Sequence, residues 1–348
     1  MDGSWIDRRN LLTAALLALC GVSGRTVHAQ VKPEKTRVAL ATGARASLNC
    51  LPLTIADRLD YFSAEGLEVD LQDHGGGMRA NQAVLEGHAE VAAGSFEQTI
   101  SLQGRNQRFS AFVMLGRSPQ VALGISNRTM PSFKNAVELK GRRVGVAMGG
   151  SSAVMVAGLV LDRVGLKSHD VQFVELATSS AAVTAIRSGQ VDAISYSEPV
   201  MTVLEQRAEV RIIADTRSLR GAQDLFGGPV VGPCLYAPAD FLLKNGRTAQ
   251  ALTNAVVHAL KWLQTAGPSD IIKVVPEAYL LGDRGLYLAS FNKIREAISV
   301  DGMIPDDGVR TALRTMARLD ASYSGDRIDL TKTFTNEFSR KAKDKFRA

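Results

Sequence analysis

Short runs of β-branched and other apolar residues alternate with longer, helix-length segments along most of the chain. This alternation is typical of βαβ units, and it predicts an α/β fold with mostly parallel sheets and flanking helices. The runs of strand length, in chain order, are residues 37–41, 67–72, 90–93, 109–115, 121–126, 144–147, 171–175, 191–194, 211–214 and 231–237.

The segments between these runs have the length and apolar spacing of helices, and several end at a glycine. The expected helices are residues 53–59, 78–86, 153–164 and 180–188, followed later in the chain by 247–266, 269–275, 284–299 and 306–319. The last four follow one another without an intervening strand. The sequence therefore predicts an α/β core with a helical C-terminal extension.

Two stretches far apart in the chain follow the same pattern. Residues 86–92 read EGHAEVA and residues 187–193 read RSGQVDA, and in each a helix end turned by glycine leads into a strand that begins with an acidic residue. This repetition predicts two lobes of similar build. We assign residues 35–126 together with 231–348 to lobe 1 and residues 127–230 to lobe 2, with hinges near residues 126–128 and 227–233.

The first part of the chain, residues 1–29, has the features of an export signal. The Arg8-Arg9 pair, as in twin-arginine signals, precedes an apolar run at residues 11–22 that is too short to cross a bilayer, and small residues precede Gln30. An alternative is a lipid anchor on Cys20, but Leu19 is larger than the small residue that such a site needs. We expect the mature chain to work in the periplasm.

Charge and composition exclude several classes of function. The net charge of +6 is spread along the chain without basic blocks among aromatic residues, which argues against nucleic-acid binding. The histidines show no zinc-ligand spacing and no phosphate loop is present, so we expect no metal and no cofactor. Cys50 and Cys234 remain after signal removal, either as a disulfide or as two separate buried thiols.

Several motifs in register carry a family resemblance. They are LTIA at residues 53–56, YFSAEGLEV at 61–69, LKGRRVGV at 139–146 and SGQVDA at 188–193. The chain resembles, from about residue 37 to 264, the nitrate/sulfonate/taurine group of substrate-binding proteins of ABC transporters. The resemblance implies a two-lobed type II periplasmic binding protein fold that holds a small solute in the cleft between lobes. It also implies a monomer that is not an enzyme and that docks on an ABC permease in the inner membrane.

The candidate ligand-binding residues lie in loops that follow strands and lead into helices. In open α/β sheets ligands bind beyond the carboxyl ends of the strands, and helix N-termini there favour anions. We therefore expect an anionic organic solute, such as a sulfonate or carboxylate. The candidates are Arg45, Ser47, Asn49, Ser95, Phe96, Arg117, Gly150, Ser151, Ser152, Tyr196 and Glu198.

Each candidate also has an interpretation without a ligand. Arg45 and Arg117 have the geometry to clamp an anion, although exposed arginines are usually only solvated. The glycine and serines of residues 150–152 can offer amides and hydroxyls or simply cap the next helix. Phe96 serves as a cavity wall or as core, and Glu198, an acidic residue common in the family, binds a ligand amine or caps its helix.

Two other functions remain open at this point. Cys50 lies before a helix N-terminus, where a thiol becomes nucleophilic, and a desulfinase branch of the same fold looks similar there. That would make the chain a cleft enzyme. A ligand-binding component of a sensory system would share the fold and the signal, and only its partner would differ.

Overall fold

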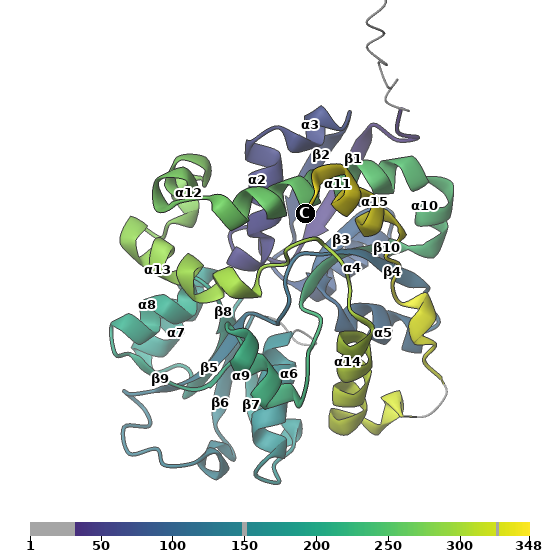
Figure 1. Ribbon diagram of the computed structural model, residues 1–348. Coiled ribbons are helices and arrows are strands. Elements are labelled where there is room, and N and C mark those ends of the chain that lie inside the picture. The colour runs from purple at the N-terminus through teal and green to yellow at the C-terminus, as the bar shows by residue number, and fades with distance from the viewer. Residues whose placement is uncertain (1–31, 148–151, 325–326) are drawn as a thin grey trace, which may run out of the picture. The chain divides into compact units, whose positions relative to one another are not determined.

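The computed structural model describes residues 32–147, 152–324 and 327–348, so the predicted export signal and the candidates Gly150 and Ser151 lie outside the described residues. Residues Pro33–Ala348 form one compact unit, whose fold follows. Its first sheet has the order β2-β1-β3-β10-β4 (Figure 1). The strands are β1 Arg37–Thr42, β2 Glu68–Asp73, β3 Val91–Ser95, β4 Phe109–Met114 and β10 Pro233–Pro238.

The second sheet repeats the plan of the first, with the order β7-β6-β8-β5-β9. Its strands are β5 Val121–Ser126, β6 Arg143–Val146, β7 Gln172–Glu175, β8 Ala193–Ser197 and β9 Val210–Asp215. We call the part of the fold built on each sheet a lobe. The predicted α/β fold with two lobes of similar build is therefore confirmed.

Both sheets are mixed, whereas the sequence predicted mostly parallel ones. In the first sheet β1 runs parallel to β2 and β3, but β10 runs antiparallel to β3 and β4. In the second sheet β5 is antiparallel to β8 and β9 in the same way. The reason is that β5 and β10 each enter a sheet directly from a crossing between lobes, without the helical crossover that a parallel strand requires.

The lobe boundary lies one strand earlier than the sequence predicted. Strand β5 belongs to the second sheet, so the chain leaves the first lobe between β4 and β5, before residue 121, and not after residue 126. It returns just before β10. The two crossings pair with each other, because the Leu115 and Gly232 amides donate to the carbonyl oxygens of Pro233 and Gly116 at 2.8 and 3.1 Å. A Cβ on Gly232 would lie 2.0 Å from the Ser118 carbonyl oxygen, so only glycine allows this approach.

Helices cover both faces of each sheet. They are α2 Leu51–Arg58, α3 Tyr61–Ala64, α4 Gly77–Leu85, α5 Glu97–Gly104, α6 Ser152–Asp162, α7 Ser179–Ser188, α8 Val200–Gln206, α9 Leu219–Phe226, α10 Ala239–Lys244, α11 Gly246–Thr265, α12 Pro268–Val274, α13 Arg284–Ile294, α14 Asp306–Leu319 and α15 Glu337–Phe346. Among the helices that the sequence pattern missed are α9 and α10. Both are short, and α9 depends on a cap in which Ser218 Oγ accepts from the Gly221 amide at 3.1 Å.

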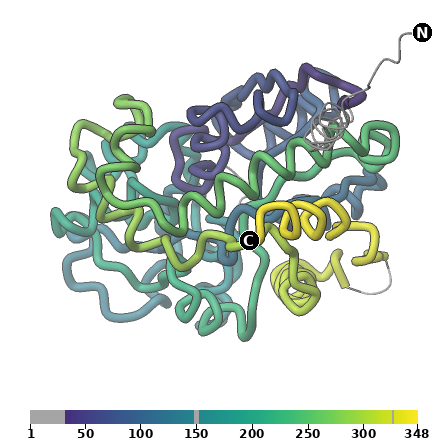
Figure 2. Tube along the Cα trace, turned by 45° about the horizontal axis from the view of Figure 1, so that its top comes forward, coloured from purple at the N-terminus to yellow at the C-terminus, as the bar shows by residue number. Residues whose placement is uncertain are grey.

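The core follows from the alternation of side chains along the strands. In β1, Leu40 packs in the hydrophobic cluster that includes α2 and α11, and its neighbour Ala41 packs in the cluster that includes α4. The C-terminal helix α15 lies beside α11 (Figures 1 and 2), where Gln250 Nε2 donates to the Phe338 carbonyl oxygen at 2.9 Å. Within the described part of the chain, no helix combines the length and apolar character needed to cross a membrane.

Candidate functional site

A cavity of about 120 Å³ lies where loops of both lobes meet. In the first lobe it is reached by the loop after β1, the start of α4 and the end of β3. In the second lobe it is reached by Ala147 after β6, by the end of β8 and by the start of α6. The lining residues are Gly43, Ala44, Ser47, Asn49, Cys50, Gly76, Gly77, Met78, Ala93, Gly94, Ser95, Gln98, Leu115, Val121, Ala147, Ser152, Ala153, Ser197 and Pro233.

Hydrogen bonds join the lobes directly around this cavity. The Ser47 and Ser197 hydroxyl oxygens lie 3.0 Å apart, and the Leu48 amide donates to the Glu198 carbonyl oxygen at 3.2 Å. On another side Ser152 Oγ, at the start of α6, donates to Glu97 Oε1 at 2.6 Å. These contacts bridge the two lobes beside the cavity.

Glu97, which contacts the lining residue Ser152 without lining the cavity itself, is among the residues that the sequence interpretation missed. It opens α5 directly after β3 and is buried, and its carboxylate accepts from Ser152 of the other lobe. Burial raises the pKa of Glu97, while the hydrogen bonds from Ser152 and Ser95 oppose the rise. An acidic residue in the first helical turn is a common capping signal, which is why its position at a cleft does not stand out in the sequence.

Four candidates from the sequence line the cavity, namely Ser47, Asn49, Ser95 and Ser152. All four are small polar residues that follow strands or open helices, as the sequence interpretation required. Asn49 presents a feature of its own, because its Oδ1 is buried and has no hydrogen-bond partner among the described residues. A buried acceptor without a donor is costly, so a bound solute is a natural source of the missing hydrogen bond.

Arg45 stands in the loop after β1 but does not line the cavity. Its Nη1 donates to the Leu71 carbonyl oxygen at 3.1 Å and its Nη2 to Asp57 Oδ2 at 3.0 Å. These bonds tie the loop to β2 and α2. The guanidinium that the sequence assigns to a ligand thus already has partners within its own lobe.

Phe96, Arg117 and Tyr196 lie elsewhere in the structure. Phe96 is fully buried in the hydrophobic core. Arg117 is exposed and lines a different cavity, near the start of α14. Tyr196 is buried, and its hydroxyl donates to the Leu176 carbonyl oxygen at 2.8 Å.

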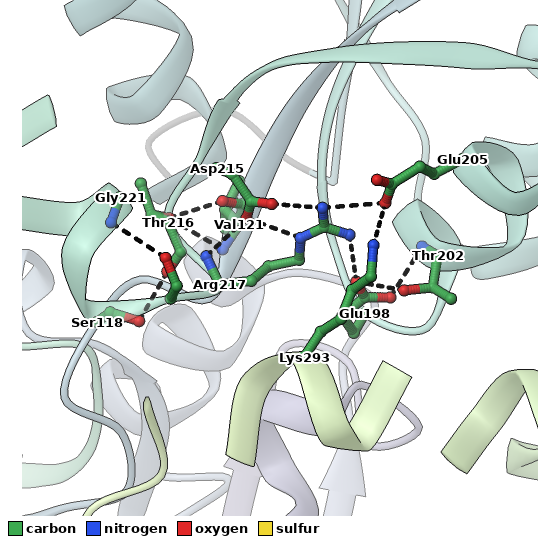
Figure 3. Close-up of polar contacts among 11 residues, drawn as sticks. Ser118, Val121, Glu198, Thr202, Glu205, Asp215, Thr216, Arg217, Gly221 and Lys293 are labelled. Carbon is green, nitrogen blue, oxygen red and sulfur yellow. Dashed lines mark hydrogen bonds and ion pairs between the residues drawn. The ribbon is translucent and has the colours of Figure 1, made fainter. Parts of the chain in front are cut away.

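Glu198 belongs to an ion cluster that we call the Arg217 cluster, formed by Glu198, Glu205, Asp215, Arg217 and Lys293 (Figure 3). Arg217 Nη1 donates to Glu198 Oε1 at 2.7 Å, and the side-chain exposures of the two residues are 2% and 0%. The amide and the hydroxyl of Thr202 also donate hydrogen bonds to the Glu198 carboxylate.

The cluster fixes the segment that carries the closing contact between the lobes. The Arg217 guanidinium also reaches Asp215 and Glu205, and Lys293 of α13 pairs with Glu205 (Figure 3). Burial lowers the pKa of Arg217, but the carboxylates of Asp215 and Glu198 outweigh it and raise the pKa above its ordinary value. The side chain of Glu198 is thus structural, while its carbonyl oxygen faces Leu48.

Both cysteines in the described part of the chain are free and buried, so the possible Cys50–Cys234 disulfide is not formed. Cys50 lines the cavity, and burial raises the pKa of its thiol to about 12, with the negative charge of Asp73 adding to the effect. A thiol of this kind is protonated at neutral pH and is a poor nucleophile. The described residues contain no group of three or more histidine, cysteine or acidic side chains that could hold a metal.

Comparison with known proteins places this geometry among binding proteins. A protein from Bordetella bronchiseptica RB50 is 45% identical, with a TM-score of 0.89, over 91% of this chain and all of that one. The alkanesulfonate-binding protein SsuA from Xanthomonas axonopodis pv. citri, solved with MOPS bound, is 16% identical with a TM-score of 0.68 over 87% of this chain and 99% of its own. This likeness shows that the chain has the fold of periplasmic binding proteins.

Two further relatives bear on the class of function. The protein YtlA of Bacillus subtilis (strain 168), named as a binding protein, is 24% identical over 251 residues, which cover 70% of this chain and 71% of its own. The desulfurization enzyme DSZB has the same fold, with 15% identity and a TM-score of 0.60 over 89% of this chain and 100% of its own. The model of the NMT1/THI5-like family matches residues 47–267, which is more than half of the sequence, and the chain therefore belongs to the NMT1/THI5-like family.

Proposed function

We propose that this chain is an exported solute-binding protein that delivers a small organic solute to an ABC importer. The observation that carries the proposal is the cavity between loops of two similar lobes, which are joined around it by direct hydrogen bonds. The alkanesulfonate-binding protein SsuA supports it by its fold. The paired arginines of the N-terminal signal favour the periplasm as the place of action, and an inner-membrane permease would receive the closed, monomeric form.

Solute capture in this proposal is a closing motion of the lobes. The two crossings, near residues 115–120 and 228–233, would absorb the rotation, as hinge segments do in other two-domain binding proteins. Opening would break the contacts Ser47–Ser197, Leu48–Glu198 and Ser152–Glu97 and expose the cavity to solvent. Closing over a solute would restore these contacts and present one continuous surface to the permease.

Filling the cavity should abolish binding without harming the fold. Ala44 lines the cavity and lies in the half-buried loop after β1, so Ala44→Phe is expected to weaken solute affinity at least tenfold by occupying the space. Ala46 lies in the same loop and does not line the cavity, and Ala46→Phe should change affinity less than twofold. The measurement is isothermal titration with solutes found in a thermal-shift screen, with mass spectrometry of the recovered solute.

Two outcomes would contradict the proposal. Equal loss of affinity in Ala44→Phe and Ala46→Phe would show that the solute binds elsewhere. Recovery of a chemically altered solute, formed at the rate of an enzyme, would favour catalysis over carriage. The likeness to the desulfurization enzyme DSZB and the position of Cys50 in the cavity wall make this the alternative that needs testing.

The state of the thiols separates the two functions. Because burial raises the pKa of Cys50 to about 12 and that of Cys234 well above its ordinary value, both thiols should resist alkylation in the native protein at pH 8. Iodoacetamide labelling followed by peptide mass spectrometry should modify them only after unfolding in guanidinium chloride. Rapid labelling of Cys50 in the native protein would instead support the nucleophile of the enzyme alternative.

A further inference from the structure

The cavity wall offers hydroxyls and amides but no positive side chain. Among its described lining residues there is no lysine, arginine or histidine. Arg45, on the loop that lines the cavity, is bound to Asp57 and to the Leu71 carbonyl oxygen. An anionic solute would therefore meet no formal countercharge in the described wall.

The carboxyl group of Glu97 lies at the helix N-termini beside the cavity, where a bound anion would be expected. Glu97 opens α5, and its Oε1 accepts at 2.6 Å from the hydroxyl of Ser152, the first residue of α6. The start of a helix attracts negative charge through its free amides and its dipole. Because the Glu97 carboxyl group occupies this place for α5 and contacts α6, a second anion here would face a like charge.

Burial supports the same conclusion. Glu97 is buried, and burial raises the pKa of its carboxyl group, which shows that negative charge is already costly at this place. In a low-dielectric surrounding, repulsion between two nearby anions is stronger than in water. An anion in the cavity would have to protonate Glu97 or to bear this repulsion.

The cavity also indicates what a solute must offer. The buried Oδ1 of Asn49 accepts no hydrogen bond from the described residues and needs an N–H or O–H donor. Met78, Leu115, Val121 and Pro233 supply apolar wall. The volume of about 120 Å³ suits a molecule of about one small ring, since an apolar cavity of roughly 150 Å³ holds benzene.

We propose that the cavity selects an uncharged solute of about the size of one small ring that carries an N–H or O–H donor, and that Glu97 discriminates against anions. This inference rests on the proposed function and replaces the anionic solute that the sequence predicted. Asn49 takes the donor hydrogen, the apolar wall covers the ring, and the hydroxyls of Ser47, Ser95 and Ser197 accept or donate around its edge.

Matched pairs of neutral and anionic molecules test the inference. Suitable probes are nicotinamide with nicotinate, benzamide with benzoate, and propanesulfonamide with propanesulfonate, each titrated calorimetrically at pH 7.5 into the purified protein. The neutral member is expected to bind at least tenfold more tightly. In Glu97→Gln, which keeps the acceptor for Ser152, this ratio should fall below threefold. The exposed Glu86, outside the cavity, supplies the control, and Glu86→Gln should keep the wild-type ratio.

The outcomes distinguish this inference from the function on which it rests. Tighter or equal binding of the anionic members would overturn the inference and would leave the solute-binding function standing. A ratio that stays at wild-type level in Glu97→Gln would remove the role of Glu97. A protein that binds neither member of any pair, while its fold is intact by circular dichroism, would contradict both the inference and the proposed function for solutes of this size.

Discussion

Replacing Arg217 by leucine is expected to lower the free energy of unfolding by about 3–5 kcal/mol, the usual cost of removing one partner from a buried ion pair. Arg217 and Glu198 have side-chain exposures of 2% and 0% and are joined at 2.7 Å. Leucine would leave the Glu198 carboxylate buried, with Thr202 as its remaining donor among the described residues. Urea denaturation followed by circular dichroism measures the loss.

Two further variants give this prediction its controls. Arg220 is exposed and lies three positions along the same segment, so Arg220→Leu should change stability by less than about 0.5 kcal/mol. The double variant Arg217→Leu with Glu198→Gln should recover part of the loss, because it removes the stranded charge. A loss below about 1 kcal/mol in Arg217→Leu would show that the Arg217 cluster is not a stabilising unit.

Joining the lobes covalently should stop solute exchange almost completely. The Ser47 and Ser197 hydroxyl oxygens belong to different lobes and lie 3.0 Å apart, so cysteines at both positions are placed to form a disulfide of about 2.05 Å. If release requires the lobes to separate, oxidised Ser47→Cys/Ser197→Cys should release bound solute at least a hundredfold more slowly than the wild type. Reduction with dithiothreitol should restore the normal rate.

The measurement is the dissociation rate of a fluorescent or calorimetrically detected solute, with the disulfide verified by mass spectrometry. Ser47→Cys and Ser197→Cys as single variants control for loss of the two hydroxyls, and the oxidised double variant should release solute at least a hundredfold more slowly than either single variant. Competition from Cys50 is disfavoured because burial raises the pKa of its thiol to about 12. Fast exchange in the oxidised double variant would show that solute enters without lobe separation.

Most strands were predictable because they contain short runs of apolar, often β-branched residues, although β2 (EVDLQD) and β7 (QFVE) contain few of them. Every expected strand overlaps one of the strands β1–β10, and the turn glycines marked where helices end, as at Gly189 with its positive φ. The direction of β5 and β10 and the lobe boundary were not predictable. Those features depend on which distant strand becomes a neighbour, and local periodicity carries no information on that choice.

The candidate site was predictable for its small polar residues but not for its charges. Ser95 ends β3 and Ser47 lies in the loop after β1, and the carboxyl ends of such strands are where ligands bind in open α/β sheets. The fate of a charged side chain depends on remote partners. Arg217 lies nineteen positions from Glu198 and forms an ion pair with its carboxylate. Nothing in the sequence around either residue indicates this pairing.

The pairing of the two crossings limits how the halves of the molecule can move. Backbone hydrogen bonds of Leu115, Gly116 and Gly232 join the two crossing segments, so these segments form one paired ribbon and not two independent linkers. A paired ribbon of this kind bends about one axis and resists sliding and twisting of one lobe against the other. Leu115 and Pro233 of this ribbon also line the cavity, so the hinge forms one side of the cavity wall. The two lobes would therefore rotate about a single hinge axis. The solute would enter and leave on the side of the cavity opposite the hinge.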